Sequence, residues 1–259
     1  EQGVKELILV AQETTVYGRD LYGKKSLHIL LKKLCEIRGI RWIRILYCYP
    51  EEIYDELIET IRDEKKICHY LDIPIQHASD RILKRMGRRT SKQELIDIVE
   101  KLRREIPDII LRTTLITGFP GETEEDHEEL KEFVDEMEFD RLGVFTYSPE
   151  ENTPAAEMAD QVPEEVKEER RDELMELQQE ISYDRGQDRI GQELLVMIEG
   201  KVADESAYIG RTYGDAPKVD GYIFVQTGEL LMTGDFAKVR VTGALEYDLI
   251  GVLSDEYTE

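Results

Sequence analysis

The sequence predicts an α/β fold, an incomplete (βα) barrel that lacks its first strand, followed by a small all-β barrel. Up to about residue 147, five β-like apolar runs alternate with amphipathic helical stripes. This order is typical of a parallel sheet with right-handed crossovers. Later in the chain the pattern changes to short alternating strands with glycine breaks, which favours a closed β-barrel. We therefore divide the chain into domains at residues 1–190 and 191–259.

Hydrophobic periodicity defines the elements of the first domain. Its predicted strands cover residues 6–11, 42–47, 70–75, 109–117 and 142–147. The first helical stripe is Leu27, Leu30, Leu31 and Leu34, with Ser26 as the expected N-cap. Later helices are marked by a stripe of Ile53, Leu57, Ile58 and Ile61, by a capping box at Ser91 and Glu94, and by a cap at Thr123.

The two ends of this domain carry separate predictions. The chain opens on Glu1-Gln2-Gly3-Val4, which resembles a helix end running into a strand, so we expect an upstream strand and helix outside this sequence. A polar helix over residues 163–190 is expected to pack across the barrel through Val166, Arg170, Leu174, Leu177 and Ile181. The acidic run over residues 122–129 is predicted to be the solvated face and first turn of the helix that Thr123 caps.

The second domain is predicted from five short strands, over residues 194–199, 207–212, 221–226, 236–244 and 248–253. From residue 192 onward it carries 13 acidic and 5 basic residues, a balance of −8. The whole chain has 57 Asp and Glu against 34 Lys and Arg, a formal net charge of −23. The electrostatic field of such a negative charge repels phosphate backbones and attracts basic partners. We therefore expect a basic partner rather than a nucleic-acid substrate.

Composition also limits location and metal binding. No apolar run approaches the roughly 20 residues that span a bilayer, so we expect a cytoplasmic protein with no membrane partner. Cys35, Cys48 and Cys68 are widely spaced and form no cluster-ligand motif. We interpret them as isolated buried thiols in a reducing compartment.

Several segments together resemble the radical S-adenosylmethionine (SAM) methylthiotransferases. They are residues 9–18 (LVAQETTVYG), 47–50 (YCYP), 71–79 (LDIPIQHAS), 86–89 (MGRR), 111–123 (LRTTLITGFPGET) and 145–155 (FTYSPEENTPA). The last 70 residues are similar to the OB-like TRAM domain that ends these enzymes. The resemblance implies a radical-SAM barrel followed by a TRAM barrel.

Within this family, the branch that modifies a ribosomal protein fits best. Residues 11–15 (AQETT) resemble its second-strand motif, and residues 210–221 (GRTYGDAPKVDG) resemble its TRAM domain. Residues 147–151 (YSPEE) carry acids where an arginine is expected in the transfer-RNA branch. The resemblance implies methylthiolation of the β-carbon of an aspartate in small-subunit ribosomal protein uS12, a basic substrate, without direct binding of transfer RNA.

The family's cofactors are SAM and two 4Fe-4S clusters, and the ligands of both clusters are absent here. The defining C-x-x-x-C-x-x-C loop does not occur in this sequence, and Fe–S clusters need thiolates. We expect that loop upstream of Glu1, together with the N-terminal domain that holds the second cluster. This chain alone is therefore expected to be inactive.

Site residues are expected at the carboxyl ends of the barrel strands. Cofactors carry the chemistry in this family, so no catalytic side chain and no metal ligand is predicted. Arg112 and Thr114 alternate with apolar neighbours and share one face, from which Arg112 would pair with the SAM carboxylate. The candidate SAM-binding residues are Gln12, Glu13, Thr14, Gln76, His77, Arg112, Thr114, Gly118, Pro120, Phe145 and Tyr147.

Several of these residues also fit a purely structural role. His77 also fits a hydrogen-bonded core residue, and Arg112 fits a member of an ion pair inside the barrel. Pro120 and Gly121 also fit a simple strand-to-helix turn. The basic cluster Arg81, Lys84, Arg85, Arg88 and Arg89 is interpreted as a solvated helix end, with contact to ribosomal RNA as the alternative.

Three other functions remain open at this stage. A transfer-RNA methylthiotransferase predicts a basic groove, which the sequence does not show. A non-catalytic binding module is the second alternative, and an ordinary (βα) barrel enzyme with an appended β-barrel is the third. The acidic second domain also fits a surface that only favours solubility.

Overall fold

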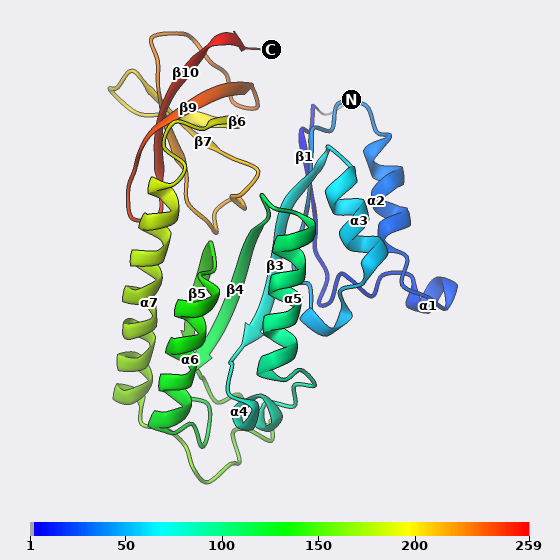
Figure 1. The fold of residues 1–259 in the computed structure, drawn as a ribbon, viewed down its shortest axis with the longest axis vertical. Coiled ribbons are helices and arrows are strands. Elements are labelled where there is room, and N and C mark those ends of the chain that lie inside the picture. Colours follow the sequence, from blue (N-terminus) through cyan, green and yellow to red (C-terminus); the bar gives the residue numbers. More distant parts are fainter. Residues whose placement is uncertain (1–2, 259) are drawn as a thin grey trace.

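The computed structural model describes residues 3–258 and the side chains of residues 3–254. Five parallel strands form one open sheet in the order β1-β2-β3-β4-β5 (Figure 1). Their bounds are Glu6–Leu9, Trp42–Ile45, Ile67–Gln76, Ile110–Thr117 and Arg141–Thr146. Each strand begins and ends within three residues of its predicted bounds, and the predicted parallel sheet is confirmed.

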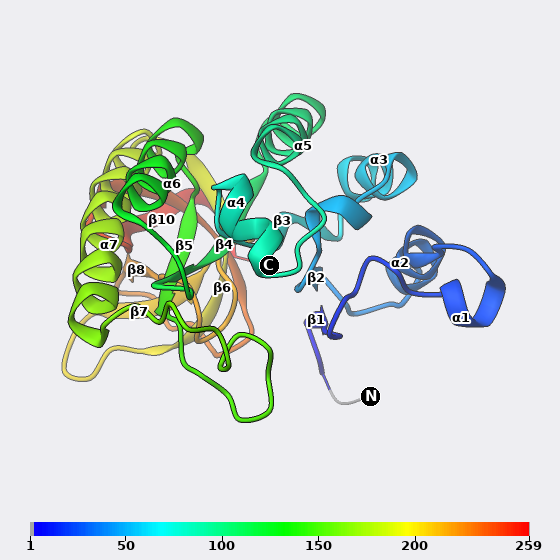
Figure 2. The same ribbon diagram turned by 90° about the horizontal axis from the view of Figure 1, so that it is seen from below.

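Helices cover one face of this sheet. They are α1 (Arg19–Tyr22), α2 (Leu27–Cys35), α3 (Asp55–Asp63), α4 (Asp80–Arg85), α5 (Lys92–Glu105), α6 (Glu124–Met137) and α7 (Glu164–Gln187), with a 3₁₀ turn η1 at Pro50–Glu52. Seen from below, helices α2, α3, α5, α6 and α7 follow an arc outside the strands (Figure 2). The fold is therefore a partial barrel, helical outside and open inside.

Strand alternation gives the sheet two different faces. Leu71, Ile73, Leu111 and Leu115 point toward the helices and are fully buried in the main core. The intervening residues of the same strands, among them Asp72, point to the other side, because successive side chains alternate. This inner face is where polar groups collect.

The helix caps predicted from the sequence are confirmed at two positions. Ser91 and Thr123 each form a reciprocal capping box, with Glu94 and Asp126 respectively. Ser26 is the residue before α2, but its hydroxyl donates to the carbonyl of Lys24 and caps no helical N–H.

Two predictions about helix faces are wrong in part. The acidic run is not wholly solvated, since Glu122 and Asp126 are buried. The apolar pattern predicts Val166 and Leu177 on the buried face of α7. The structure instead buries the neighbouring residues Lys167 and Gln178. These polar side chains are buried because they reach strand-end carbonyls: Lys167 Nζ donates to Tyr147 O, and Gln178 Nε2 donates to Phe139 O.

The C-terminal strands form a closed barrel in the order β10-β8-β7-β6-β9. Their bounds are β6 (Glu193–Lys201), β7 (Ala207–Arg211), β8 (Ile223–Gln226), β9 (Phe236–Ala244) and β10 (Leu249–Thr258). Val196, Ile223, Val225 and Val239 fill its centre. Among residues 3–258, no helix is long and apolar enough to cross a membrane.

This barrel sits at the amino-terminal ends of the sheet strands, opposite the arrowheads (Figure 1). Trp42, the first residue of β2, meets Phe236 of β9 edge-on with ring centroids 4.9 Å apart. A Cβ added to Gly214 would stand 2.8 Å from Ile110 Cγ1, so only glycine allows the β7–β8 loop to approach β4 this closely. The two domains therefore share a packed interface.

Candidate cofactor cavity

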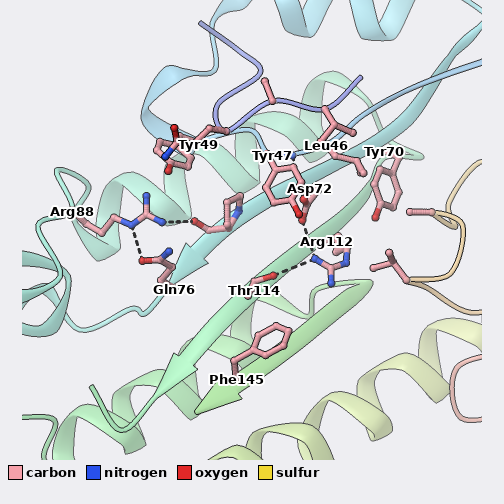
Figure 3. Close-up of a pocket in the computed structure, with 16 residues that line it drawn as sticks. Leu46, Tyr47, Tyr49, Tyr70, Asp72, Gln76, Arg88, Arg112, Thr114 and Phe145 are labelled. Atoms are coloured by element: carbon pink, nitrogen blue, oxygen red, sulfur yellow. Dashed lines mark hydrogen bonds and ion pairs between the residues drawn. The ribbon is translucent and has the colours of Figure 1, made fainter. Parts of the chain in front are cut away.

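A cavity of about 680 Å³ lies on the inner face of the sheet (Figure 3). Residues of all five sheet strands, or of the segments directly after them, line it, and the β7–β8 loop closes its floor with Ala216 and Val219. The remaining lining residues are Val10, Ala11, Gln12, Leu46, Tyr47, Tyr49, Tyr70, Asp72, Pro74, Gln76, Arg88, Arg112, Thr114 and Phe145. The cavity thus joins aromatic rings to a few convergent polar groups, which is typical of a small-molecule site.

Five of the predicted site residues line this cavity: Gln12, Gln76, Arg112, Thr114 and Phe145. Gln12 follows β1, and Gln76 ends β3. Arg112 and Thr114 occupy alternate positions of β4 and point inward together, as the alternation predicts (Figure 3).

Glu13 and Thr14 do not line the cavity, and their side chains bond to neighbouring segments of the chain. The Glu13 carboxylate accepts from the N–H groups of Thr15 and Tyr49 at 2.8 Å each. Thr14 is buried, and its hydroxyl donates to Leu46 O at 2.6 Å. Both residues tie the segment after β1 to the segment after β2, and neither lines the cavity.

His77 and Gly118 belong to a buried hub around Glu122. His77 is fully buried, and its Nδ1 accepts from Ser79 N while Nε2 lies 3.5 Å from Glu122 Oε2. The same oxygen accepts from Gly118 N at 2.8 Å, and Arg170 pairs with the other oxygen at 3.0 Å. The hub links the end of β3, the β4–α6 turn and α7.

Pro120 and Tyr147 also lie outside the cavity lining. Pro120 accepts a hydrogen bond from Arg85 Nε at 2.9 Å through its carbonyl. Tyr147 packs edge-on against Phe119, with ring centroids 5.2 Å apart. The segment of residues 118–121 is thus packed against α4 and α7 in this structure.

Arg112 is held by carboxylates from both domains. Its Nη1 donates to Asp72 Oδ1 at 3.0 Å and to Thr114 Oγ1 at 3.1 Å, while Nε lies 3.3 Å from Asp220 Oδ1. Burial alone would lower the pKa of Arg112, but the neighbouring Tyr70, Asp72 and Asp220 outweigh burial and raise it. Arg112 is therefore a charged member of an internal ion-pair network.

Among the lining residues that sequence reasoning missed, Arg88 is the cation. Its Nε donates to Gln76 Oε1 at 3.0 Å, its Nη2 to Pro74 O at 3.3 Å, and its guanidinium lies 4.7 Å from the centroid of the Tyr49 ring. All of these partners are neutral, and no carboxylate of the described residues pairs with Arg88. Arg88 thus brings a fixed, uncompensated positive charge to the wall.

The interpretation of the basic cluster as a solvated helix end is accordingly wrong for Arg88, which enters the cavity. Arg81 and Arg85 stay at the surface, where Arg81 pairs with Asp126 and Arg85 donates to Asp160 at 2.8 Å. A signal was available in the sequence, because Arg88 lies in the segment 86–89 (MGRR), which carries part of the family resemblance.

Two cavity residues adopt left-handed backbone conformations without being glycine. Tyr47 has φ 59° and Gln76 has φ 74°. Non-glycine residues rarely occupy this region, and such strain concentrates at ligand sites. The Tyr47 N–H donates to Asp72 Oδ2 at 3.2 Å, and Arg88 holds the Gln76 side chain, so both strained residues are anchored by cavity charges.

The cysteines do not fit a cluster. Cys48 and Cys68 are buried and Cys35 is half-buried, and no three metal-binding side chains converge among the described residues. Burial raises the pKa of Cys48 well above its usual range, that of Cys68 to about 12 and that of Cys35 to about 11. A metal ion deprotonates the thiols that it binds, so the raised pKa values do not decide the question; the separation of these cysteines argues against a cluster site among the described residues.

Comparison with known proteins agrees with this architecture. Residues 1–134 match the Radical SAM superfamily, and residues 190–253 match the TRAM domain. Coproporphyrinogen III oxidase (HemN) from Escherichia coli, described as a radical SAM enzyme, has a similar fold with a TM-score of 0.50 at 17% identity, covering 82% of this chain and 50% of that one.

Two curated relatives are similar over nearly the whole chain. "Ribosomal protein uS12 methylthiotransferase RimO" of Lachnoclostridium phytofermentans is 68% identical over 97% of this chain and 57% of its own length. The protein of the same name from Clostridium botulinum is 54% identical over 100% of this chain and 58% of its own length. This chain therefore spans a little more than half the length of these relatives, and it belongs to the radical SAM superfamily, with a TRAM domain at residues 190–253.

Proposed function

We propose that this chain is the SAM-binding and TRAM portion of a methylthiotransferase that modifies an aspartate of ribosomal protein uS12. The observation that carries the proposal is the 68% identity to a relative bearing that name, over 97% of this chain. The inner-face cavity supports it, because it is the large polar and aromatic site that the barrel offers.

The residues of the cavity fit SAM. A guanidinium without a counter-charge binds a carboxylate well, so Arg88 rather than the compensated Arg112 is assigned to the carboxylate of the methionine part. Gln12, Gln76 and Thr114 offer donors and acceptors for the amino and ribose groups. Aromatic rings such as Phe145 offer stacking for adenine.

In this family, bound SAM supplies the radical and the methyl group. The chain's own residues orient it, exclude water and hold the wall charges in place. The cluster ligands are assigned to parts of the longer protein, since the cysteines described here do not fit that role.

A basic ribosomal protein as partner is supported by the formal charge of −23. The acidic balance of the TRAM domain supports it less than its composition indicates. Asp215 and Asp220 are buried against Arg141 and Arg112 of the barrel, and Glu199 pairs with Arg211. Those acids serve the domain interface, and exposed acids such as Asp204 and Glu205 remain for a basic partner in the cytoplasm.

Competition between two substrates tests this function. The full-length gene product, with clusters reconstituted anaerobically, would receive SAM, sulfide and a reductant together with uS12 and unmodified transfer RNA. Mass spectrometry is expected to find a methylthio group on a uS12 aspartate. The same group on an adenosine would overturn the proposal in favour of the transfer-RNA branch. A gene without a cysteine triad upstream would instead favour a non-catalytic module.

A further inference from the structure

The TRAM domain places a buried carboxylate beneath the floor of the cavity. The Asp220 side chain is 2% exposed and lies between β7 and β8. Its Oδ2 accepts from Tyr70 Oη at 2.7 Å and from Ala216 N at 2.8 Å, while Oδ1 lies 3.3 Å from Arg112 Nε. Tyr70, Arg112 and Ala216 all line the cavity, so one TRAM carboxylate holds three parts of its wall.

The contacts of Asp220 continue across the floor. Arg112 donates to Asp72, and Asp72 accepts from the backbone N–H of the strained Tyr47. The sequence of contacts Asp220–Arg112–Asp72–Tyr47 therefore joins the TRAM domain to a residue on the far wall of the cavity. Each link is a charged hydrogen bond or an ion pair, and the three charged side chains in it are mostly buried.

We propose that Asp220 is a positioning residue for the cofactor cavity, so that TRAM docking and SAM binding are energetically coupled. Arg112 needs both carboxylates to stay centred on the floor. With Asp220 neutralised, Arg112 keeps only Asp72 and is drawn toward the wall of β3. The cavity then loses the arrangement of Arg112 and Tyr70 in which SAM fits, and coupling of this kind acts in both directions.

The chain offers a matched control. Asp215 comes from the same β7–β8 segment, is also buried, and pairs with Arg141 across the same interface at 2.6 Å. Neither Asp215 nor Arg141 lines the cavity. Asp215→Asn therefore weakens the interface by similar chemistry without removing a side-chain partner of a cavity residue, whereas Asp220→Asn removes the partner of both Arg112 and Tyr70.

Trp42 reports whether the domains stay docked. It is the one tryptophan of the sequence, is buried, and touches Phe236 of the TRAM domain. An unchanged Trp42 emission spectrum in the 259-residue chain carrying Asp220→Asn shows that docking persists. A loss of ligand affinity in the same variant then reflects positioning and not separation of the domains.

Calorimetry of the full-length protein with its clusters, using S-adenosylhomocysteine as the probe, tests the proposal. Asp220→Asn is expected to weaken binding roughly tenfold with unchanged Trp42 emission, while Asp215→Asn binds like the wild type. Wild-type affinity in Asp220→Asn, or an equal loss in Asp215→Asn, would overturn it.

The inference rests on the assignment of the cavity to SAM, and a further variant separates the two. Arg88→Gln weakens the probe if the cavity assignment is correct. If Arg88→Gln binds normally, the cavity assignment fails and takes the role of Asp220 with it. If Arg88→Gln is weakened and Asp220→Asn is not, only the role of Asp220 fails.

Discussion

At the scale of single residues, the cavity is defined by which charges are already paired. Arg112 and Arg88 both reach the inner face, but Asp72 and Asp220 compensate only the first. The sequence predicts that Arg112 points inward, because alternation along a strand is a local property. It cannot show that Asp220, more than 100 residues later, supplies the second counter-charge.

Replacing Arg88 tests the assignment of the uncompensated cation. Arg88→Gln is expected to weaken binding of S-adenosylhomocysteine by roughly 10- to 100-fold, because a charged hydrogen bond to the carboxylate is lost. Arg89→Gln is the matched control, since Arg89 is exposed and does not line the cavity. Equal losses in the two variants would indicate general electrostatic attraction and contradict a specific contact.

The carboxylate of Asp126 makes the free energy of unfolding depend on pH. Burial would raise its pKa, but hydrogen bonds from Arg81, Ser79 and Thr123 outweigh burial and lower it below the usual range. A carboxylate with a lowered pKa stabilises the fold above its unfolded-state pKa, and this contribution is lost as the pH falls below about 4 toward its folded-state pKa.

Asp126→Asn is accordingly expected to cost about 2 kcal/mol of unfolding free energy at pH 7 and progressively less below pH 4. Chemical denaturation at several pH values measures the difference. Asp135→Asn, at an exposed position of the same helix, should change stability little at any pH. A pH-independent effect of Asp126→Asn would contradict the ionic explanation.

At the scale of elements, the sequence predicts the order and type of nearly every strand and helix, because periodicity and caps are local signals. The misassignments share one cause. Lys167, Gln178, Glu122 and Asp126 are polar residues buried by a partner that lies far away in the sequence. The six predicted site residues that lie outside the cavity lining follow strand ends, but they make contacts within the protein: five through their own side chains or carbonyls and Gly118 through its backbone N–H.

The turn after β4 offers a test of packing that is separable from backbone strain. Gly118 has φ +71°, and a Cβ there would stand 2.1 Å from Lys167 Cγ. Gly118→Ala is expected to cost about 3 kcal/mol or more, since the buried Lys167 cannot move without losing its bond to Tyr147 O.

Gly39→Ala serves as the control for this variant. Gly39 also has a positive φ, +89°, but nothing lies within 4 Å of an added Cβ, so only the backbone term of about 1–2 kcal/mol applies. Thermal and denaturant unfolding compare the two variants. Equal destabilisation would show that the contact with α7 contributes nothing.

At the scale of the whole molecule, the TRAM domain is a structural part of the barrel. Arg211 is 3% exposed and pairs with Glu6 of β1 at 2.6 Å and with Glu199 of β6 at 2.7 Å. Arg44 joins the same cluster through Glu6 and through the carbonyl of Tyr213. Such buried pairs are costly to break because the remaining charges stay buried.

Loss of one of these ion-pair partners should therefore make the two domains unfold at different temperatures. Arg211→Gln is expected to split a single unfolding transition into two, with Trp42 fluorescence changing before the far-UV signal of the barrel. Lys238→Gln, which removes an exposed pair within the TRAM barrel, should keep one transition. A single transition in Arg211→Gln would contradict strong coupling between the domains.

The inner-face cavity is proposed above as the SAM site of the longer enzyme. The most direct measurement is a crystal structure of the full-length protein with its clusters and S-adenosylhomocysteine. The predicted result is ligand density in the cavity, with the carboxylate on Arg88 and the Arg112–Asp220 pair intact beneath it. Density outside the cavity, or a carboxylate with no contact to Arg88, would contradict the account.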